Sequence, residues 1–242
     1  MLTIDYRLLG VRDGERVLDI GCGGGRHSLE ACKIADCLVY ALDVDSEELG
    51  NLGQMFQALH EQGEERGRWA LIRGSILTLP FPDASFDKII CSEVLEHIID
   101  DNKGVSEIVR VLKDDGMIAV SVPNYLPEAI CWKLSRDYHN QPGGHIRIYK
   151  NGELAAKLEQ NNLCINVTRR KHALHSIYWI FRCLFGYGRE KAIIPSLYYK
   201  FLVWDLKTGT RMVRFIDDFL NHIFPKSIAF YASKVPGERN EP

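Results

Sequence analysis

The sequence predicts an α/β fold: a doubly wound, seven-stranded, mostly parallel sheet with a helical insertion before its last strand. Three observations lead to this prediction. Strand-like and helix-like segments alternate along the 242 residues, as in parallel sheets covered by helices on both faces. The first apolar run ends in a glycine-rich turn at residues 21–25, where doubly wound sheets often bind ligands. A segment at 175–224, rich in aromatic and basic residues, interrupts the alternation late in the chain.

We expect residues 1–242 to form a single domain, with 175–224 as a helical cap between the last two strands. The expected strands are, in chain order, Arg16–Ile20, Leu38–Asp43, Trp69–Ile72, Phe86–Cys91, Met117–Val122, Leu163–Val167 and Ser227–Ala232. The helices expected outside the insertion are Arg26–Ile34, Ser46 to about His60, one starting near Asn102, and Glu153–Gln160. The helix near Asn102 places Val105, Ile108, Val109 and Leu112 on one face, and Gly116 ends the turn after it.

Composition narrows the class of protein. The chain is 46% hydrophobic and 26% charged, which is ordinary for a globular protein. A net charge of −2 gives no overall electrostatic case for nucleic acid. The seven cysteines are odd in number and form no C-x-x-C pair, which favours a reducing compartment over a disulfide scaffold or a zinc site. We therefore expect a cytoplasmic protein without a metal, and the N-terminus shows no signal-peptide pattern.

The glycine-rich turn indicates the ligand. Its glycines lack Cβ, so a small molecule can lie against the backbone. A dinucleotide fingerprint needs a third glycine at its sixth position, which is Arg26 here. Asp19, two residues before the first glycine, would repel a pyrophosphate but can accept from an ammonium group. The run V-L-D-I-G-C-G-G-G resembles motif I of the class I S-adenosylmethionine (SAM) methyltransferases, with a nucleotide-binding or dehydrogenase protein as the alternative.

The resemblance implies a Rossmann-like fold and a set of SAM-binding residues. At the turn these residues are Asp19, Gly21, Cys22, Gly23 and Gly25. Asp43, at the end of the second strand, is placed to bind the ribose hydroxyls, with Val44 beside it. The alternative is that Asp43 is a turn or capping residue, although Asp45 and Ser46 are better placed to cap the helix that follows.

The segment Arg73–Asp87 is similar to one in quinone-biosynthesis-like methyltransferases, which matches at Leu79-Pro80-Phe81, Asp83 and Ser85-Phe86-Asp87. That family usually has an aspartate that accepts from the adenine amino group. Here the position is Ser75, a neutral acceptor, and the backbone of Ile76 can also serve.

The fourth strand's exit, Cys91–Ile98, is similar to the family segment that lines the methionine side of SAM, which implies contacts from Cys91 and Glu93. The N/D-P-P-Y/F turn of methyltransferases that modify base amines is not found in the sequence. Tyr125 follows Val122-Pro123-Asn124 and either lines the acceptor side or packs. The resemblance covers about residues 15–170.

His145 is the candidate catalytic base, because imidazole titrates where a base is useful and a Gly-Pro loop carries it on the ligand side. The alternative is that His145 orders the loop or orients the substrate. For His97, packing or contact with the cofactor edge is the favoured role.

The segment 169–224 carries the information about the acceptor. Half of the 24 aromatic residues lie between Tyr178 and Phe224, and residues 169–214 hold ten basic and two acidic residues, a local charge of +8. Three interpretations stay open: an extra packing layer, a lid that walls an apolar acceptor pocket, and contact of 169–214 with an anionic membrane. RNA binding is disfavoured, since the basic residues alternate with core-like apolar ones.

The predicted function is SAM-dependent methyl transfer to a small apolar, phenolic or lipid-like acceptor, with S-adenosylhomocysteine as the product. The alternative is a SAM-fold binding or regulatory partner protein without turnover of its own. The sequence leaves the oligomeric state open.

Overall fold

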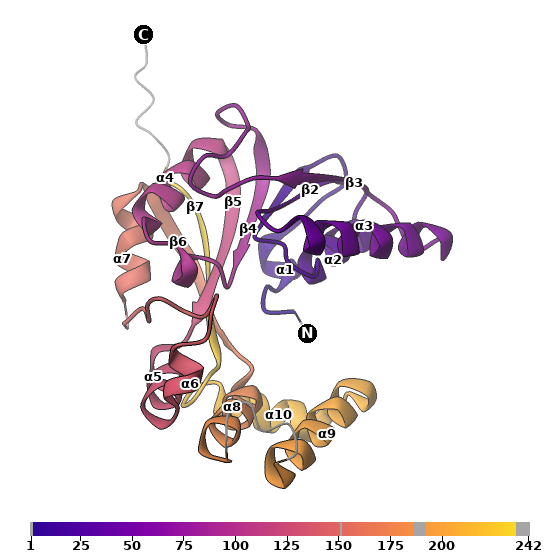
Figure 1. The fold of residues 1–242 in the computed structure, drawn as a ribbon. Coiled ribbons are helices and arrows are strands. Elements are labelled where there is room, and N and C mark those ends of the chain that lie inside the picture. Colours follow the sequence, from indigo (N-terminus) through magenta and orange to yellow (C-terminus); the bar gives the residue numbers. More distant parts are fainter. Residues whose placement is uncertain (1, 151, 186–191, 236–242) are drawn as a thin grey trace.

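The computed structural model describes residues 2–150, 152–185 and 192–235. Its single seven-stranded sheet has the order β3-β2-β1-β4-β5-β7-β6 (Figure 1). β7 runs antiparallel to both β5 and β6, and the other neighbouring strands are parallel. The strands are β1 (Arg16–Ile20), β2 (Leu38–Asp43), β3 (Arg68–Arg73), β4 (Phe86–Ser92), β5 (Leu112–Pro123), β6 (Leu163–Lys171) and β7 (Ser227–Lys234). The predicted fold class and the predicted strands are confirmed.

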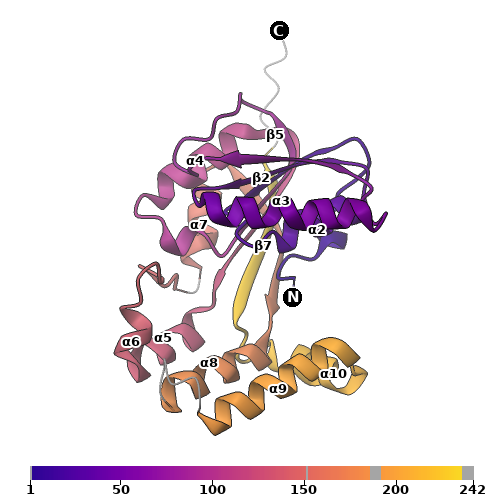
Figure 2. The ribbon, with the colours of Figure 1, turned by 45° about the vertical axis from the view of Figure 1, so that its right-hand side comes forward.

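Helices cover both faces of the sheet (Figures 1 and 2). One face packs on α1 (Tyr6–Leu9), α2 (Arg26–Ile34) and α3 (Ser46–Glu61), through buried residues such as Ala31, Leu52 and Phe56. The other packs on α4 (Asp101–Val111) and α7 (Glu153–Gln160), through buried residues such as Ile108 and Leu158. The carboxyl ends of the strands therefore lie at an edge of the sheet between its two helix-covered faces.

Two details around β5 differ from the sequence prediction. β5 starts at Leu112, so this residue belongs to the strand and not to the preceding helix, and the pairing with β4 shifts between Phe86 and Lys88. After β5 the chain forms α5 (Tyr125–Leu134) and α6 (Arg136–His139), where the sequence suggested only a loop. Asn124 caps α5 by accepting from the Leu126 amide at 3.3 Å. Pro127 lies in the first turn, where its missing N–H costs nothing.

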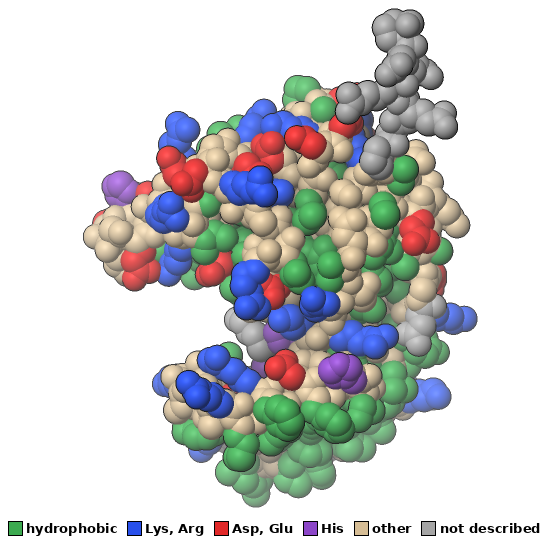
Figure 3. Space-filling view, turned by 180° about the vertical axis from the view of Figure 1, so that it is seen from behind, with side chains coloured by type: hydrophobic (Ala, Val, Ile, Leu, Met, Phe, Trp, Pro, Cys, Tyr) green, Lys and Arg blue, Asp and Glu red, His purple; other side chains and the backbone are tan. Residues whose placement is uncertain are grey.

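Among the described residues, three helices lie between β6 and β7: α8 (Ala173–Phe185), α9 (Ile193–Thr208) and α10 (Arg211–Leu220). We call them the helical layer. They lie beyond the carboxyl ends of β5 and β6, and α8 packs against α5, α9 and α10 (Figure 1). A small core of Leu174, Leu202 and Val213 holds them together. Figure 3 shows a hollow between this layer and the rest of the molecule.

Candidate active site

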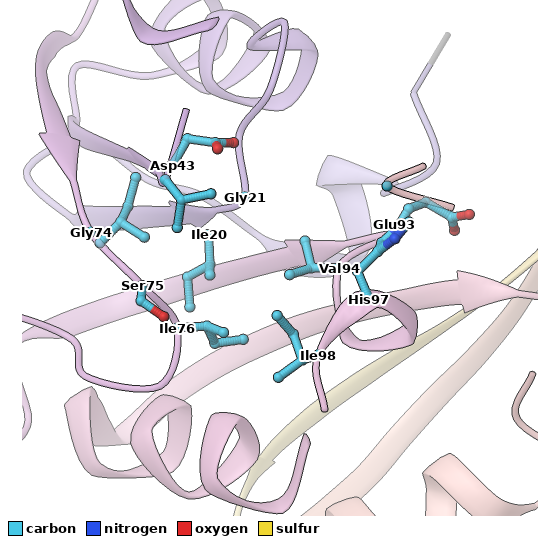
Figure 4. A pocket seen from close by; sticks show the side chains of 13 residues that line it. Ile20, Gly21, Asp43, Gly74, Ser75, Ile76, Glu93, Val94, His97 and Ile98 are labelled. Carbon is cyan, nitrogen blue, oxygen red and sulfur yellow. The ribbon is translucent and has the colours of Figure 1, made fainter. Parts of the chain in front are cut away.

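A cavity of about 330 Å³ opens at the carboxyl ends of β1, β2 and β4, and we call it the cofactor cavity (Figure 4). The site residues expected from the sequence that line it are Gly21, Asp43, Val44, Ser75, Ile76 and Glu93. Its remaining lining residues are Ile20, Leu42, Gly74, Val94, His97, Ile98 and Gly143.

The glycine turn reaches the cavity through Gly21, and its backbone favours glycine at three positions. Gly21, Gly23 and Gly25 have φ of 64°, 46° and 70°, in the left-handed region that disfavours side chains. A Cβ on Gly25 would collide with Leu52, whereas one on Gly23 would meet no atom within 4 Å. The turn is thus packed tightly on one side and open above Gly23.

Asp43 holds the turn and still faces the cavity. Its Oδ2 accepts from the Gly23 amide at 2.8 Å, and its Oδ1 accepts from the Asp45 amide at 3.0 Å. Asp45, not Asp43, caps α3 by accepting from the Glu47 and Glu48 amides. A carboxylate has about four lone-pair sites, so Asp43 keeps acceptor capacity for two hydroxyl groups.

Asp19 lies behind the glycine turn and does not line the cavity. It is 2% exposed, and its Oδ2 accepts from the Ser28 hydroxyl of α2 at 2.6 Å. Burial raises the pKa of Asp19 to about 6, against the lowering effect of the Ser28 hydroxyl. Gly23 and Gly25 are also outside the lining, as are Cys22 and Cys91, both buried. Their direct contact with SAM stays a prediction.

Ser75 and Glu93 lie at opposite sides of the cavity (Figure 4). The Ser75 Oγ accepts from the Leu77 amide at 3.2 Å, so the hydroxyl also stabilises its own turn. Glu93 has φ of 60°, an uncommon value for a residue with a side chain and one that concentrates at functional sites. Ser121 holds it there: its carbonyl accepts from the Glu93 amide at 2.8 Å, and its hydroxyl donates to Oε1 at 3.1 Å.

A second cavity, of about 220 Å³, adjoins the first, and His97 and Gly143 line both. We call it the His145 cavity. Aromatic side chains from three helices contribute to its wall: Trp132 of α5, Tyr138 of α6 and Trp179 of α8. Its other lining residues are Glu128, Gln141, Gly144, His145 and Lys226. The helical layer thus supplies one wall residue, Trp179.

His145 is oriented by a buried carboxylate. Its Nδ1 lies 2.7 Å from Oε1 of Glu128, which is 2% exposed. The other Glu128 oxygen accepts from the Tyr138 hydroxyl at 3.1 Å and from Lys226 Nζ at 3.4 Å. Burial alone would raise the pKa of Glu128, but His145, Lys226 and Tyr138 outweigh it and hold that pKa at about 2. Glu128 is therefore a charged acceptor, and the Nδ1–H of His145 donates to it.

Glu96 and His97, on the short 3-10 helix η1 (Leu95–His97), complete the cluster. Glu96 is fully buried, and its carboxyl oxygens contact no hydrogen-bond partner in the described part of the chain. Burial and the nearby Glu93 raise the pKa of Glu96. Its Oε1 lies 3.9 Å from His97 Nε2 and 4.0 Å from His145 Nε2.

Sequence reasoning missed Glu96 and Glu128. A signal for Glu128 did exist, because it is the only charged residue in the run Tyr125–Trp132. Trp179 and Lys226 come from segments far from His145 in the sequence, so only the tertiary structure brings them to this cavity. His97 lies at the cofactor edge, one of the two roles considered for it.

The residues of the cofactor cavity fit SAM. Gly21 brings backbone without a side chain to the cavity wall, and Asp43 can accept from ribose hydroxyls. The apolar side chains of Leu42 and Ile76 suit an adenine ring, and the Glu93 carboxylate suits an ammonium group. Across the described ranges, the helices are too short or too polar to span a bilayer.

Comparisons with known proteins identify the family of the chain. A family model described as "Methyltransferase domain" matches residues 18–120. The chain is 32% identical over 190 residues to the uncharacterized methyltransferase YcgJ of Bacillus subtilis, covering 77% of this chain and 72% of YcgJ. It is 29% identical over 143 residues to the sterol 24-C-methyltransferase erg6 of Aspergillus fumigatus, covering 58% of this chain and 34% of that enzyme.

Solved structures share the fold. A Bacillus halodurans protein classed as a methyltransferase has a TM-score of 0.63 at 17% identity, with 96% of both chains covered. The crystal structure of YcgJ has a TM-score of 0.56 at 23% identity, covering 94% of this chain and 96% of YcgJ. With the glycine turn, Asp43 and the mixed sheet in place, the chain belongs to the class I SAM-dependent methyltransferases, and it is an enzyme that uses SAM.

Proposed function

We propose that this enzyme transfers the methyl group of SAM to a small apolar, phenolic or lipid-like acceptor bound in the His145 cavity. The adjacency of the two cavities carries the proposal, because His97 and Gly143 line both. The aromatic wall of the His145 cavity favours an acceptor with apolar surface. The similarity to a sterol methyltransferase supports an apolar acceptor but does not identify it.

SAM supplies an activated methyl group on a sulfonium, so the protein must align the acceptor and exclude water. Trp132, Tyr138 and Trp179 position the apolar body of the acceptor. His145 activates its nucleophilic atom. Because the Nδ1–H donates to Glu128, the lone pair of Nε2 is available on the other side of the ring.

Variants of the His145 cavity test the proposal. His145→Asn and Trp179→Ala should retain SAM affinity, measured by calorimetry, because neither residue lines the cofactor cavity. Both should lose most methyl transfer from isotopically labelled SAM to a panel of sterols, prenylated phenols and acyl lipids. Exposed His60, next to Glu65 on the surface, provides the control His60→Asn, which should keep full turnover. Full turnover by both cavity variants would exclude this cavity as the acceptor site.

We also propose that the helical layer contacts an anionic lipid surface that holds the acceptor. α10 and the turn after it expose one apolar stripe at helical spacing: Met212, Phe215, Ile216, Phe219 and Ile223, each between 42% and 74% exposed. α9 adds exposed Ile193, Leu197, Trp204 and Leu206. Figure 3 shows hydrophobic side chains gathered on the outer side of the layer. Exposed patches of this kind mark interaction sites.

Exposed basic side chains also favour an anionic lipid surface. Lys200, Lys207, Arg211 and Arg214 are exposed on the same two helices, which carry three acidic residues as well, Asp205, Asp217 and Asp218. Each basic side chain near an anionic membrane contributes about 1 kcal/mol.

Sedimentation with vesicles tests this contact. The full chain should bind phosphatidylcholine vesicles with about 30% phosphatidylglycerol more strongly than pure phosphatidylcholine vesicles. Phe215→Ser with Phe219→Ser should abolish binding. Met55→Ser, which removes an exposed apolar side chain of α3, is the matched control. Concentration-dependent dimerisation lost in the double variant, without vesicle binding, would assign the surface to a second copy instead.

A further inference from the structure

We infer that Glu96, His97 and His145 form a binding site for one divalent cation of the zinc type, between the cofactor cavity and the His145 cavity. One ligand atom from each of the three side chains lies within 4.8 Å of the others. The inference rests on the proposed function and deepens it, because it says how His145 activates the acceptor.

The ring orientations of both histidines support this site. His145 Nδ1 is engaged by the Glu128 carboxylate at 2.7 Å, and His97 Nδ1 by the Gly144 carbonyl at 3.1 Å. Both partners are acceptors, so each Nδ1 carries the proton and each Nε2 keeps its lone pair. Metal-binding histidines are fixed in this way, with the second nitrogen donating to a carboxylate or a carbonyl.

The two free lone pairs converge on a carboxyl group that lacks partners. Glu96 Oε1 lies 3.9 Å from His97 Nε2 and 4.0 Å from His145 Nε2, too far for hydrogen bonds. Zinc–nitrogen and zinc–oxygen bonds of about 2.0–2.2 Å at tetrahedral angles place two ligands of one ion roughly 3.3–3.6 Å apart. The two separations from Glu96 would therefore shorten by about 0.5 Å on binding, and the cation would give the fully buried Oε1 of Glu96 the partner that it lacks.

Three protein ligands leave one position open, as in catalytic zinc sites. His97 lines both cavities, so an ion held here would be close to an acceptor in one cavity and to SAM in the other. A hydroxyl acceptor would bind the cation through oxygen, and its O–H bond would break with the proton passing to water. The oxygen–methyl bond then forms as the sulfonium–methyl bond breaks, giving the methyl ether and S-adenosylhomocysteine. This chemistry points to hydroxyl or phenol acceptors.

This cation site differs from the expectation, made from the sequence, that the protein binds no metal. That expectation rested on cysteine spacing, whereas these ligands are two adjacent residues and a histidine 48 positions beyond His97. Six of the seven cysteines are buried, and none belongs to this cluster.

Titration of the chelator-treated full chain with zinc alone tests the site. The chain should bind one Zn²⁺, and Glu96→Gln and His145→Asn should weaken that affinity at least about 100-fold. Glu128→Gln, which removes the carboxylate behind His145, should weaken it about 10- to 100-fold. His60→Asn should change nothing, although His60 also contacts a carboxylate, that of Glu65. Zinc should raise the Tm of the wild type but not of Glu96→Gln.

Glu96→Gln should fold, because it keeps the side-chain volume and removes a buried carboxylate without partners. Absence of one-to-one zinc binding, or equal binding by Glu96→Gln, would overturn the inference. So would a thiolate charge-transfer band in the Co²⁺-loaded chain, since it would assign the ion to cysteines. Undiminished methyl transfer by the metal-free enzyme would overturn the role in activation yet leave the proposed function standing. Zinc binding without methylation of any acceptor would leave the cation site standing and overturn the proposed function.

Discussion

Replacing Glu128 with glutamine should lower stability and activity together, by amounts that the structure sets. The carboxylate is buried, with its oxygens engaged by His145, Tyr138 and Lys226. Its pKa falls from an ordinary 4.5 to about 2 in the folded protein. A lowering of that size corresponds to about 3 kcal/mol of stability at neutral pH.

The pH dependence has a definite sign. The folded-state pKa of Glu128 is depressed, so its contribution is fully present above about pH 4.5 and is lost as the pH falls toward 2. The stability difference between wild type and Glu128→Gln should therefore shrink from about 3 kcal/mol at pH 7 to about 2 kcal/mol at pH 3.5. Urea unfolding at several pH values, monitored by tryptophan fluorescence, measures this difference.

Activity should fall because the ring of His145 loses its charged partner. We expect kcat to drop about 10- to 100-fold while SAM affinity is unchanged, since Glu128 does not line the cofactor cavity. Asp87→Asn is the matched control: Asp87 accepts from Lys113 Nζ and the Arg16 amide at the amino end of β4, away from both cavities. That variant should lose stability and keep kcat. A Glu128→Gln enzyme with normal kcat, or a stability difference independent of pH, would refute this reasoning.

Three other substitutions test the cofactor side. Asp43→Ala should weaken SAM binding by about 1.5–3 kcal/mol in calorimetry, the contribution of a charged hydrogen bond, and unchanged affinity would remove Asp43 from the site. Ser75→Asp should keep or raise SAM affinity by supplying a charged acceptor for adenine; a strong loss would show that the adenine is held differently. Asp19→Asn should stabilise the protein above about pH 6, because the raised pKa of buried Asp19 means that ionisation costs stability as pH rises from its unfolded value of 3.8. Thermal unfolding at pH 8 checks this, and a lower Tm for the variant would contradict it.

The sequence could predict six of the residues that line the cofactor cavity because they are encoded locally. Asp43, Ser75 and Glu93 each lie at or just after the end of a strand, and the ends of neighbouring parallel strands meet at one edge. Periodicity located each strand to within a few residues. The longer span of β5, from Leu112, was missed because its first residues follow α4 without a break and include charged Lys113, Asp114 and Asp115.

The acceptor side was harder to predict because its residues converge from distant segments. Glu128 lies 17 positions from His145 and 98 from Lys226, yet all three contact one another through the same carboxylate. The hydrogen-bond geometry that leaves both histidine Nε2 atoms free depends on the Gly144 carbonyl, which no side-chain pattern reveals. The sequence therefore identified His145 but not the group that orients it.

Basic residues in and beside the helical layer support its proposed contact with lipid. Residues 169–214 carry +8 within a chain of net charge −2, which leaves −10 on the remainder. Three of the ten basic residues, Arg169, Arg170 and Lys171, belong to β6, and Asp217 and Asp218 of α10 lie just outside the range. Such a separation would turn the layer toward an anionic surface before contact, at a rate that falls with ionic strength. Trp179 of α8 contributes to the His145 cavity, while α9 and α10 carry the exposed apolar side chains. A lipid-like acceptor taken up at this surface would then pass the helical layer on its way to His145. If vesicle binding did not change with salt concentration, the apolar stripe would bind the lipid surface without this electrostatic contribution.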